Sequence, residues 1–292
     1  MACTALGMVA CSTTSNKVTV ESANQDSRIN IVVLHHTSEP FGGSLQVLTE
    51  PSSRPVSSHY LVPEPLDPSY SEDKLKVYSL VPEDKRAWHA GHSYWKGQSK
   101  LNNASIGIEI VNDTYCHRPE NPVQEGTADW PSETFCFYPD YPEVQIALVL
   151  ELLKDITSRY PDIKPTHIVG HSDIAPQRKI DPGPRFPWQR LYRMGFGAWY
   201  DDDTVVKYWE LFRSGLPSVL QVQQALDSYG YRIELTGELD EQTRNVLRAF
   251  QLHFLPYRVS SEITLETVAV LYAMVDKYYP GDVESLLPAG RD

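Results

Sequence analysis

An apolar run at residues 168–170 leads directly into a loop crowded with ionisable residues and prolines. A short run of this kind is typical of a buried strand. Residues 171–184 then contain a histidine, two aspartates, an arginine and a lysine, and their prolines argue against a helix there. Loops that follow buried strands often carry the chemistry of a domain. We therefore expect residues 171–184 to form part of a functional site.

Residues 105–111 predict a second strand, in which isoleucine alternates with other residues. The three isoleucines share one face, whereas Ser105, Gly107 and Glu109 share the other. A carboxylate in such an apolar strand is costly unless it has a partner or a task, and burial raises its pKa toward that of a general base. The alternative is an edge strand with Glu109 in water, but the apolar flanks favour a function.

Further strands and one long helix define the fold class. We expect strands at residues 28–34, 56–63, 77–81 and 166–170, a short helix at 45–49, and a long helix from Pro142 to about Tyr160. This mixture predicts an α/β domain over residues 28–200. The first strand ends at His35 and His36, and only one of these can face a common site because successive strand residues point in opposite directions.

The C-terminal part predicts helices alone. The acidic stretch that begins near residue 201 predicts a linker over residues 201–215. Apolar stripes and two capping residues, Asp240 and Thr264, then predict a small three-helix bundle over residues 216–282. No cluster of ionisable residues there indicates catalysis.

The four cysteines fall into two pairs of different meaning. Residues 1–27 resemble the end of a bacterial lipoprotein signal followed by a polar tether, with Cys11 at the lipidation position. Met8 departs from the expected leucine and a basic start is missing, so an incidental cysteine in a disordered N-terminus is the alternative. In an exported protein Cys116 and Cys136 are expected to form a disulfide within the loop 112–141, and two free buried thiols are the alternative.

Net charge narrows the possible partners. The chain carries 38 acidic and 26 basic residues, for a net charge of −12. A nucleic-acid-binding protein would need a basic face, so we expect no nucleic-acid partner. The sequence also lacks a run of eighteen apolar residues, so a transmembrane helix is not expected.

Residues from separate segments could together form a catalytic zinc site. Such sites use three protein ligands and keep the fourth position for water, which two histidines and one aspartate would satisfy. A nearby carboxylate could act as the general base, and an ammonium group could stabilise an oxyanion. No compact zinc motif is present, so spacing alone leaves the metal site open. The candidates are His35, Glu109, His171, Lys179 and Asp181.

Several motifs together resemble the zinc-dependent N-acetylmuramoyl-L-alanine amidase family, which includes phage amidases and peptidoglycan recognition proteins. The motifs are His35-His36-Thr37, residues 56–62, Ala87-Trp88-His89-Ala90-Gly91, residues 105–109 and residues 171–183. The resemblance implies a mixed central β-sheet flanked by helices, and one zinc ion held by His35, His171 and Asp181. It also implies Glu109 as catalytic acid/base and Lys179 as transition-state stabiliser.

The implied reaction is hydrolysis of the amide between N-acetylmuramic acid, intact or in the 1,6-anhydro form, and L-alanine of the stem peptide. We expect a monomer whose partners are peptidoglycan or muropeptides. The C-terminal part resembles a peptidoglycan-binding module, and a purely structural role is the alternative for it. We expect the protein to lie on the periplasmic face of the outer membrane.

The alternative functions are those of a non-catalytic recognition protein and of a cytoplasmic recycling amidase. The candidate substrate-binding residues are His59, Trp88, His89, Asn102 and Arg178. For each of them, an ordinary surface or packing role is the alternative.

Overall fold

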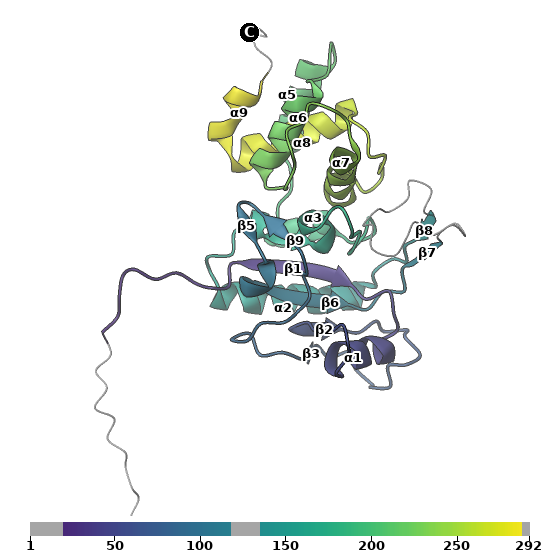
Figure 1. Cartoon of the computed structure of the whole chain (residues 1–292). Helices are drawn as coiled ribbons and strands as arrows, with labels where there is room; N and C mark the ends of the chain where they lie inside the picture. Colours follow the sequence, from purple (N-terminus) through teal and green to yellow (C-terminus); the bar gives the residue numbers. More distant parts are fainter. Residues whose placement is uncertain (1–19, 118–134, 288–292) are drawn as a thin grey trace, which may run out of the picture.

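The central element of the fold is a mixed sheet. The structure, a computed structural model, describes residues 20–117 and 135–287. Within these residues the largest sheet has the strand order β3-β2-β6-β1-β9 (Figure 1). Its strands are β1 (Ile31–His36), β2 (Tyr60–Val62), β3 (Tyr78–Ser79), β6 (Ser105–Ile110) and β9 (Ile168–Gly170). Only β3 runs antiparallel to its neighbour, so the predicted mixed sheet is confirmed.

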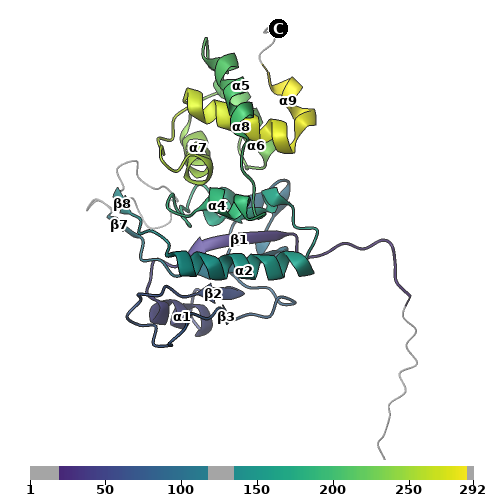
Figure 2. The same cartoon turned by 180° about the vertical axis from the view of Figure 1, so that it is seen from behind.

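Strand β1 is buried because most of its residues are apolar and it has a neighbouring strand on each side. Every residue of β1 is buried, as expected for a parallel strand with neighbours on both sides. Helix α2 (Glu143–Arg159) lies across one face of the sheet (Figure 2) and buries the apolar stripe predicted for it. Helix α1 (Phe41–Thr49) lies at the β2–β3 end and begins four residues before the predicted short helix.

One prediction for the loop after β9 is wrong. Residues His171–Ile174 form a helical turn, α3, although prolines were expected to exclude a helix. The first proline of this segment is Pro176, and a proline restricts itself and the residue before it rather than residues further upstream. The remaining elements of this domain are β4 (Tyr94–Trp95), β5 (Gln98–Ser99), β7 (Tyr115–His117), β8 (Phe135–Phe137), α4 (Trp188–Arg193) and the 3₁₀ turns η1 (Leu101–Asn103) and η2 (Pro165–His167).

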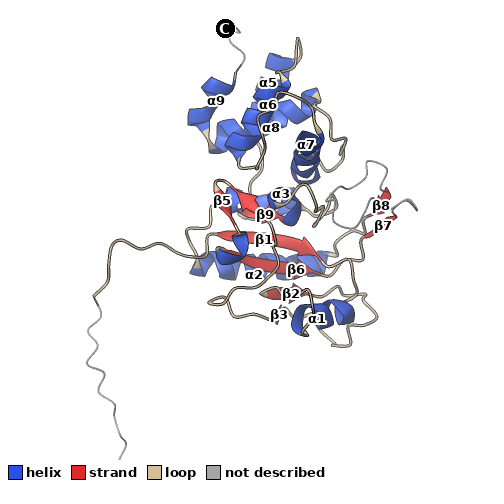
Figure 3. Ribbon diagram, viewed as in Figure 1, coloured by secondary structure: helices blue, strands red, loops and turns tan. Residues whose placement is uncertain are grey.

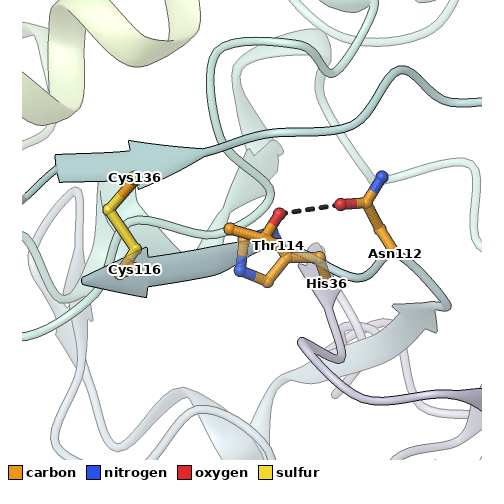
Figure 4. The surroundings of a disulfide bond; sticks show 5 residues. All are labelled: His36, Asn112, Thr114, Cys116 and Cys136. Carbon is orange, nitrogen blue, oxygen red and sulfur yellow. Dashed lines mark hydrogen bonds between the residues drawn. A yellow bond between two sulfur atoms is a disulfide. The ribbon is translucent and has the colours of Figure 1, made fainter.

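The paired cysteines join two short strands. Strands β7 and β8 are antiparallel, and Cys116 lies directly opposite Cys136. Their sulfurs form a disulfide, the pairing expected for an exported protein (Figure 4). The sequence indicated only a loop here, because each strand has three residues and no clear alternation of apolar and polar side chains.

The described residues of the C-terminal part contain helices joined by loops and no strand (Figure 3). The three predicted helices are present as α6 (Val219–Tyr229), α7 (Glu241–Phe254) and α8 (Leu265–Tyr278). Both predicted caps are made, since the side chains of Asp240 and Thr264 accept backbone N–H groups of α7 and α8. A final helix, α9 (Pro280–Leu286), follows.

The predicted linker at residues 201–215 is wrong. It contains helix α5 (Asp202–Phe212), whose Tyr208 and Phe212 are buried and pack against Tyr272 of α8. The acidic residues that seemed to mark a break, Asp202 and Asp203, occupy the first turn of this helix, where negative charge is favourable to the helix dipole. No helix in the described ranges combines the length and apolarity needed to cross a membrane.

The helical part is joined to the sheet domain by a buried polar network. It lies beside β9 and α3 (Figure 1), where the Asp173 carboxylate of α3 is 1 % exposed. This carboxylate accepts the Tyr231 hydroxyl at 2.6 Å, the His253 Nδ1–H at 2.8 Å and the Gly170 backbone N–H at 2.8 Å. Because Asp173 follows His171 by two residues, the helical part helps to fix the position of the His171 turn.

Tyr231→Phe should therefore destabilise the whole protein. The substitution removes one donor from a buried carboxylate, and hydrogen bonds to charged groups contribute about 1.5–3 kcal/mol. We expect a loss of this size in the free energy of unfolding measured by denaturant titration. Tyr229→Phe is the matched control, because that buried ring makes no hydroxyl hydrogen bond with another described residue. Equal stability of the two variants would contradict the role of the network.

Candidate active site

The predicted catalytic residues meet at one edge of the sheet. Strands β6, β1 and β9 are parallel neighbours, so their carboxyl ends lie together. His35 lies near the end of β1 opposite Glu109 of β6, and His171 follows β9 directly. Asp181 reaches them because its carbonyl accepts the Ser172 backbone N–H at 2.9 Å.

A glycine makes this approach possible. A Cβ on Gly170 would lie 2.8 Å from Cδ of Pro182 and 3.3 Å from the Asp181 carbonyl oxygen. Any side chain at Gly170 would therefore push the Asp181 segment away from the end of β9. The apolar run at residues 168–170 thus ends in glycine because two backbone segments pass close together there.

Three potential metal ligands converge in the site. Nδ1 of His35 lies 2.9 Å from Nδ1 of His171, and each of these atoms lies 3.1 Å from Oδ2 of Asp181. The three side chains are buried, and they are a group of residues able to hold a metal ion. Two histidines and one carboxylate are the donor set of many catalytic zinc sites.

Electrostatics favour a cation among these atoms. Burial lowers the pKa of His171 to about 3, so its ring is neutral and offers a lone pair. Burial alone would raise the pKa of Asp181, but His171, His35 and Lys179 hold it well below its usual value. A neutral imidazole and a carboxylate oxygen therefore face one another, an arrangement that a bound cation stabilises.

Glu109 lies beside the ligands without joining them. Its Oε1 is 3.9 Å from Nδ1 of His35, and its buried Oε2 has no hydrogen-bond partner among the described residues. Burial raises the pKa of Glu109 to about 7, while His35 lowers this pKa and Asp181 raises it. A carboxyl group that changes protonation near neutral pH is suited to general acid/base catalysis.

His36 is not among the three converging ligands. Thr114 donates its hydroxyl proton to Oδ1 of Asn112 at 2.7 Å, and the same hydroxyl lies 3.3 Å from Nδ1 of His36 (Figure 4). The hydroxyl proton is already used, so the His36 ring donates to Thr114. The structure thus separates the neighbouring histidines as strand geometry requires, with His35 in the cluster.

The cluster opens into a pocket of about 210 Å³. Trp88, which is 45 % exposed, forms part of its wall, as the sequence motif predicts. Lys179 also lines the pocket, so every predicted ligand and catalytic residue reaches this space. The complete lining is His35, His36, Thr37, Glu39, Ser44, Val47, Leu48, Val56, Ser57, Trp88, His89, Glu109, His171, Lys179 and Asp181.

Three predicted substrate-binding residues do not line this pocket. His59 is fully buried, and its ring bonds to the Gly107 N–H and the Lys85 carbonyl. Oδ1 of Asn102 accepts the backbone N–H groups of His89 and Ala90, which holds the Trp88-His89 turn in place. Both side chains hydrogen-bond to the backbone around the site and so help to hold it in place.

Arg178 is likewise absent from the lining of this pocket. Its guanidinium donates to the carbonyls of Ala90 and His92 and lines a separate hollow beside the helical part. The guanidinium thereby ties the loop after β9 to the segment that follows Trp88-His89, and its Nη2 also lies 3.2 Å from Nε2 of His171. Ser105 and Gly107, to which the sequence assigned no role in the site, lie against His89. The signal that could have identified them is that they share a strand face with Glu109.

Both parts of the chain match known family models. The family model for N-acetylmuramoyl-L-alanine amidase (Amidase_2) matches residues 25–184, and that for a peptidoglycan-binding domain matches residues 216–271. The chain is 40 % identical over 252 residues to N-acetylmuramoyl-L-alanine amidase AmiD of Escherichia coli, covering 86 % of this chain and 84 % of that protein.

Two solved structures share the fold over nearly the whole chain. The structure of AmpDh3 from Pseudomonas aeruginosa with anhydromuramic pentapeptide is 41 % identical, with a TM-score of 0.78, and covers 93 % of this chain and 99 % of that chain. The structure of Escherichia coli AmiD with the substrate anhydro-N-acetylmuramic acid-L-Ala-D-gamma-Glu-L-Lys has 37 % identity, a TM-score of 0.72, and coverages of 89 % and 93 %. The chain therefore belongs to the N-acetylmuramoyl-L-alanine amidase family, and it is an amidase of that class.

Proposed function

We propose that this amidase holds one zinc ion with His35, His171 and Asp181 and hydrolyses the amide between N-acetylmuramic acid and L-alanine of peptidoglycan stem peptides. The observation that carries the proposal is the convergence of two imidazole Nδ1 atoms and one carboxylate oxygen within 3.1 Å of one another, beside a buried glutamate. Muropeptides with 1,6-anhydro ends are proposed substrates, because the structures of two relatives were obtained with such ligands.

The surrounding residues suit the steps of amide hydrolysis. Zinc, when bound, lowers the pKa of a coordinated water from 15.7 to about 7 and so supplies a nucleophile at neutral pH. Glu109 takes up the proton released during attack on the amide carbon and passes it to the leaving nitrogen of L-alanine. The Lys179 ammonium, which lines the same pocket, stabilises the negative charge that develops on the carbonyl oxygen.

The same residues argue against a purely binding protein. A recognition protein needs a pocket but no ligand set, no buried glutamate and no lysine facing the same space. Here all five side chains line one pocket. The exposed Trp88 at its wall offers a flat surface for a sugar ring or peptide, so binding and hydrolysis use the same hollow.

Mass spectrometry of the products tests this function. The purified protein is incubated with peptidoglycan sacculi and, separately, with 1,6-anhydro muropeptides, each with and without a zinc chelator. We expect peptides that begin with a free L-alanine amino group and muramyl residues that end in a free lactyl carboxylate. The chelator should abolish both products. Intact substrate in every sample would contradict the proposal, and comparison of the two substrates shows which end is preferred.

We also propose that the helical C-terminal part binds the cell wall. It matches a peptidoglycan-binding domain model, and it packs against the domain that carries the site. Its position beside the His171 turn would keep a bound glycan strand close to the pocket. The two parts would then act on one substrate as a single unit, most simply within a monomer.

The proposed location is the periplasmic face of the outer membrane, with a lipid on Cys11. Cys11 lies outside the described residues, so this proposal rests on the small residues before it and the polar tether after it. The disulfide between Cys116 and Cys136 supports an oxidising compartment such as the periplasm. A cytoplasmic recycling amidase would have no use for either feature.

Cys11→Ser should abolish incorporation of labelled palmitate in a bacterial host that processes lipoproteins. The thiol of Cys11 is the proposed attachment point, so its loss leaves no site for the lipid. Cys3→Ser is the matched control, because Cys3 belongs to the part of the signal that would be removed, and it should leave labelling unchanged. Full labelling of Cys11→Ser would contradict the anchor.

A further inference from the structure

His89 lies between a serine of β6 and one of the proposed zinc ligands. Its side chain is buried, and its ring passes over Gly107, where an added Cβ would lie 2.5 Å from the ring. Nε2 of His89 is 3.1 Å from the hydroxyl oxygen of Ser105, and Nδ1 is 3.0 Å from Nε2 of His35. The bare backbone at Gly107 therefore makes room for a ring that links Ser105 to His35.

The donors and acceptors among Ser105, His89 and His35 can be assigned from their hydrogen-bond partners. Ser105 has one hydroxyl proton and donates it to the Leu101 carbonyl at 2.7 Å, since a carbonyl can only accept. The Ser105 oxygen must then accept from Nε2–H of His89. Among the described residues no carboxylate pairs with His89, so the buried ring is neutral and its Nδ1 carries a lone pair.

The ring proton of His35 is assigned in the same way. Because Nδ1 of His89 can only accept, Nε2 of His35 must donate to it. A neutral His35 ring has no second proton, so its Nδ1 presents a lone pair toward His171 and Asp181. Nε2 of His171 has different neighbours: it lies 3.3 Å from the Ala90 carbonyl oxygen and 3.2 Å from Nη2 of Arg178.

We propose that Ser105 and His89 are positioning residues that fix His35 in the tautomer with Nδ1 free to bind metal. The inference rests on the proposed zinc site and assigns His89 a role other than direct contact with substrate. Hydrogen-bond partners of metal-binding histidines typically change metal affinity by about 10- to 100-fold when removed. We call these hydrogen bonds, from Ser105 through His89 to His35, the relay. The relay accounts for a buried serine in β6 and for the glycine beneath His89.

Variants at His89 separate the relay from packing. His89→Leu keeps a similar volume but removes both ring nitrogens, and we expect zinc affinity, measured by competition with a chromogenic chelator, to fall about 10- to 100-fold. His89→Asn places an amide oxygen near the position of Nδ1, so it should accept from His35 and restore most of the affinity. Ser105→Ala removes one hydroxyl only and should give a smaller loss in the same direction.

Nitrogen NMR of the zinc-free protein gives a readout that packing alone would not change. In wild type, Nδ1 of His35 should be unprotonated and Nε2 protonated, whereas His89→Leu should show a mixture of both tautomers. His167→Leu is the control, because His167 is another buried imidazole that bonds to a backbone carbonyl away from the site, and it should leave zinc affinity unchanged.

The outcomes separate the relay from the zinc site itself. A wild type that does not bind zinc would contradict the proposed function. Wild-type affinity in His89→Leu, or a protonated Nδ1 of His35 in the wild-type protein, would overturn the relay while leaving the zinc site intact. If His89→Leu does not fold, Ser105→Ala decides the question: unchanged affinity and an unchanged tautomer in that variant would overturn the relay.

Discussion

Glu109→Gln should lower kcat by roughly 100- to 10,000-fold while one zinc ion per chain remains bound, the range typical for removal of a general acid/base. The amide keeps the size of the side chain but cannot take up the proton released during attack. Glu109 is not among the three converging ligand atoms, so the metal should stay in place. Turnover is measured on a defined muropeptide, and zinc is measured by elemental analysis of the same sample.

The matched control for this prediction is Asp113→Asn. Asp113 is an exposed carboxylate three residues beyond the end of β6, and its neutralisation should change turnover little. Wild-type turnover in Glu109→Gln would remove Glu109 from the mechanism. Loss of zinc from that variant would instead make Glu109 part of the metal site.

His171→Ala should lose both metal and activity. The substitution removes one of three ligands, and two remaining side chains hold zinc too weakly to survive dialysis. We expect zinc content to fall from about one ion per chain to almost none, and product formation to fall to background. Elemental analysis and chromatography of the products measure the two effects on one preparation.

A buried histidine outside the site provides the comparison for that loss. His167 lies four residues earlier, in the 3₁₀ turn η2 before β9, and bonds to the Asn30 carbonyl. His167→Ala should keep its zinc even if its stability falls. Stoichiometric zinc in His171→Ala would show that the ligand set is wrong.

The strands that position the site could be predicted because their patterns are simple. Alternating isoleucines in β6 place Glu109 and Gly107 on one face, and the structure places both beside His35 or its partner His89. The resemblance to the amidase family also named five candidate ligands and catalytic residues, all of which line the pocket. Strand alternation left two choices for the histidine pair, and the resemblance to the amidase family indicated His35.

Other features depend on contacts that sequence patterns do not encode. The polar atoms of His59 and Asn102 bond to backbone groups, and no local pattern distinguishes such a role from substrate binding. Helix α5 was read as a linker because its acidic start looks like a break, whereas packing on α8 stabilises it. The network around Asp173 joins residues up to 80 positions apart, a separation that no periodic pattern reveals.

Zinc K-edge X-ray absorption of the purified, zinc-loaded enzyme tests the proposed metal site most directly. We expect a shell of two imidazole nitrogens at about 2.0–2.1 Å and of oxygen ligands, from Asp181 and water, at about 2.0–2.2 Å. A sulfur ligand at about 2.3 Å, or a shell without imidazole, would contradict the site formed by His35, His171 and Asp181.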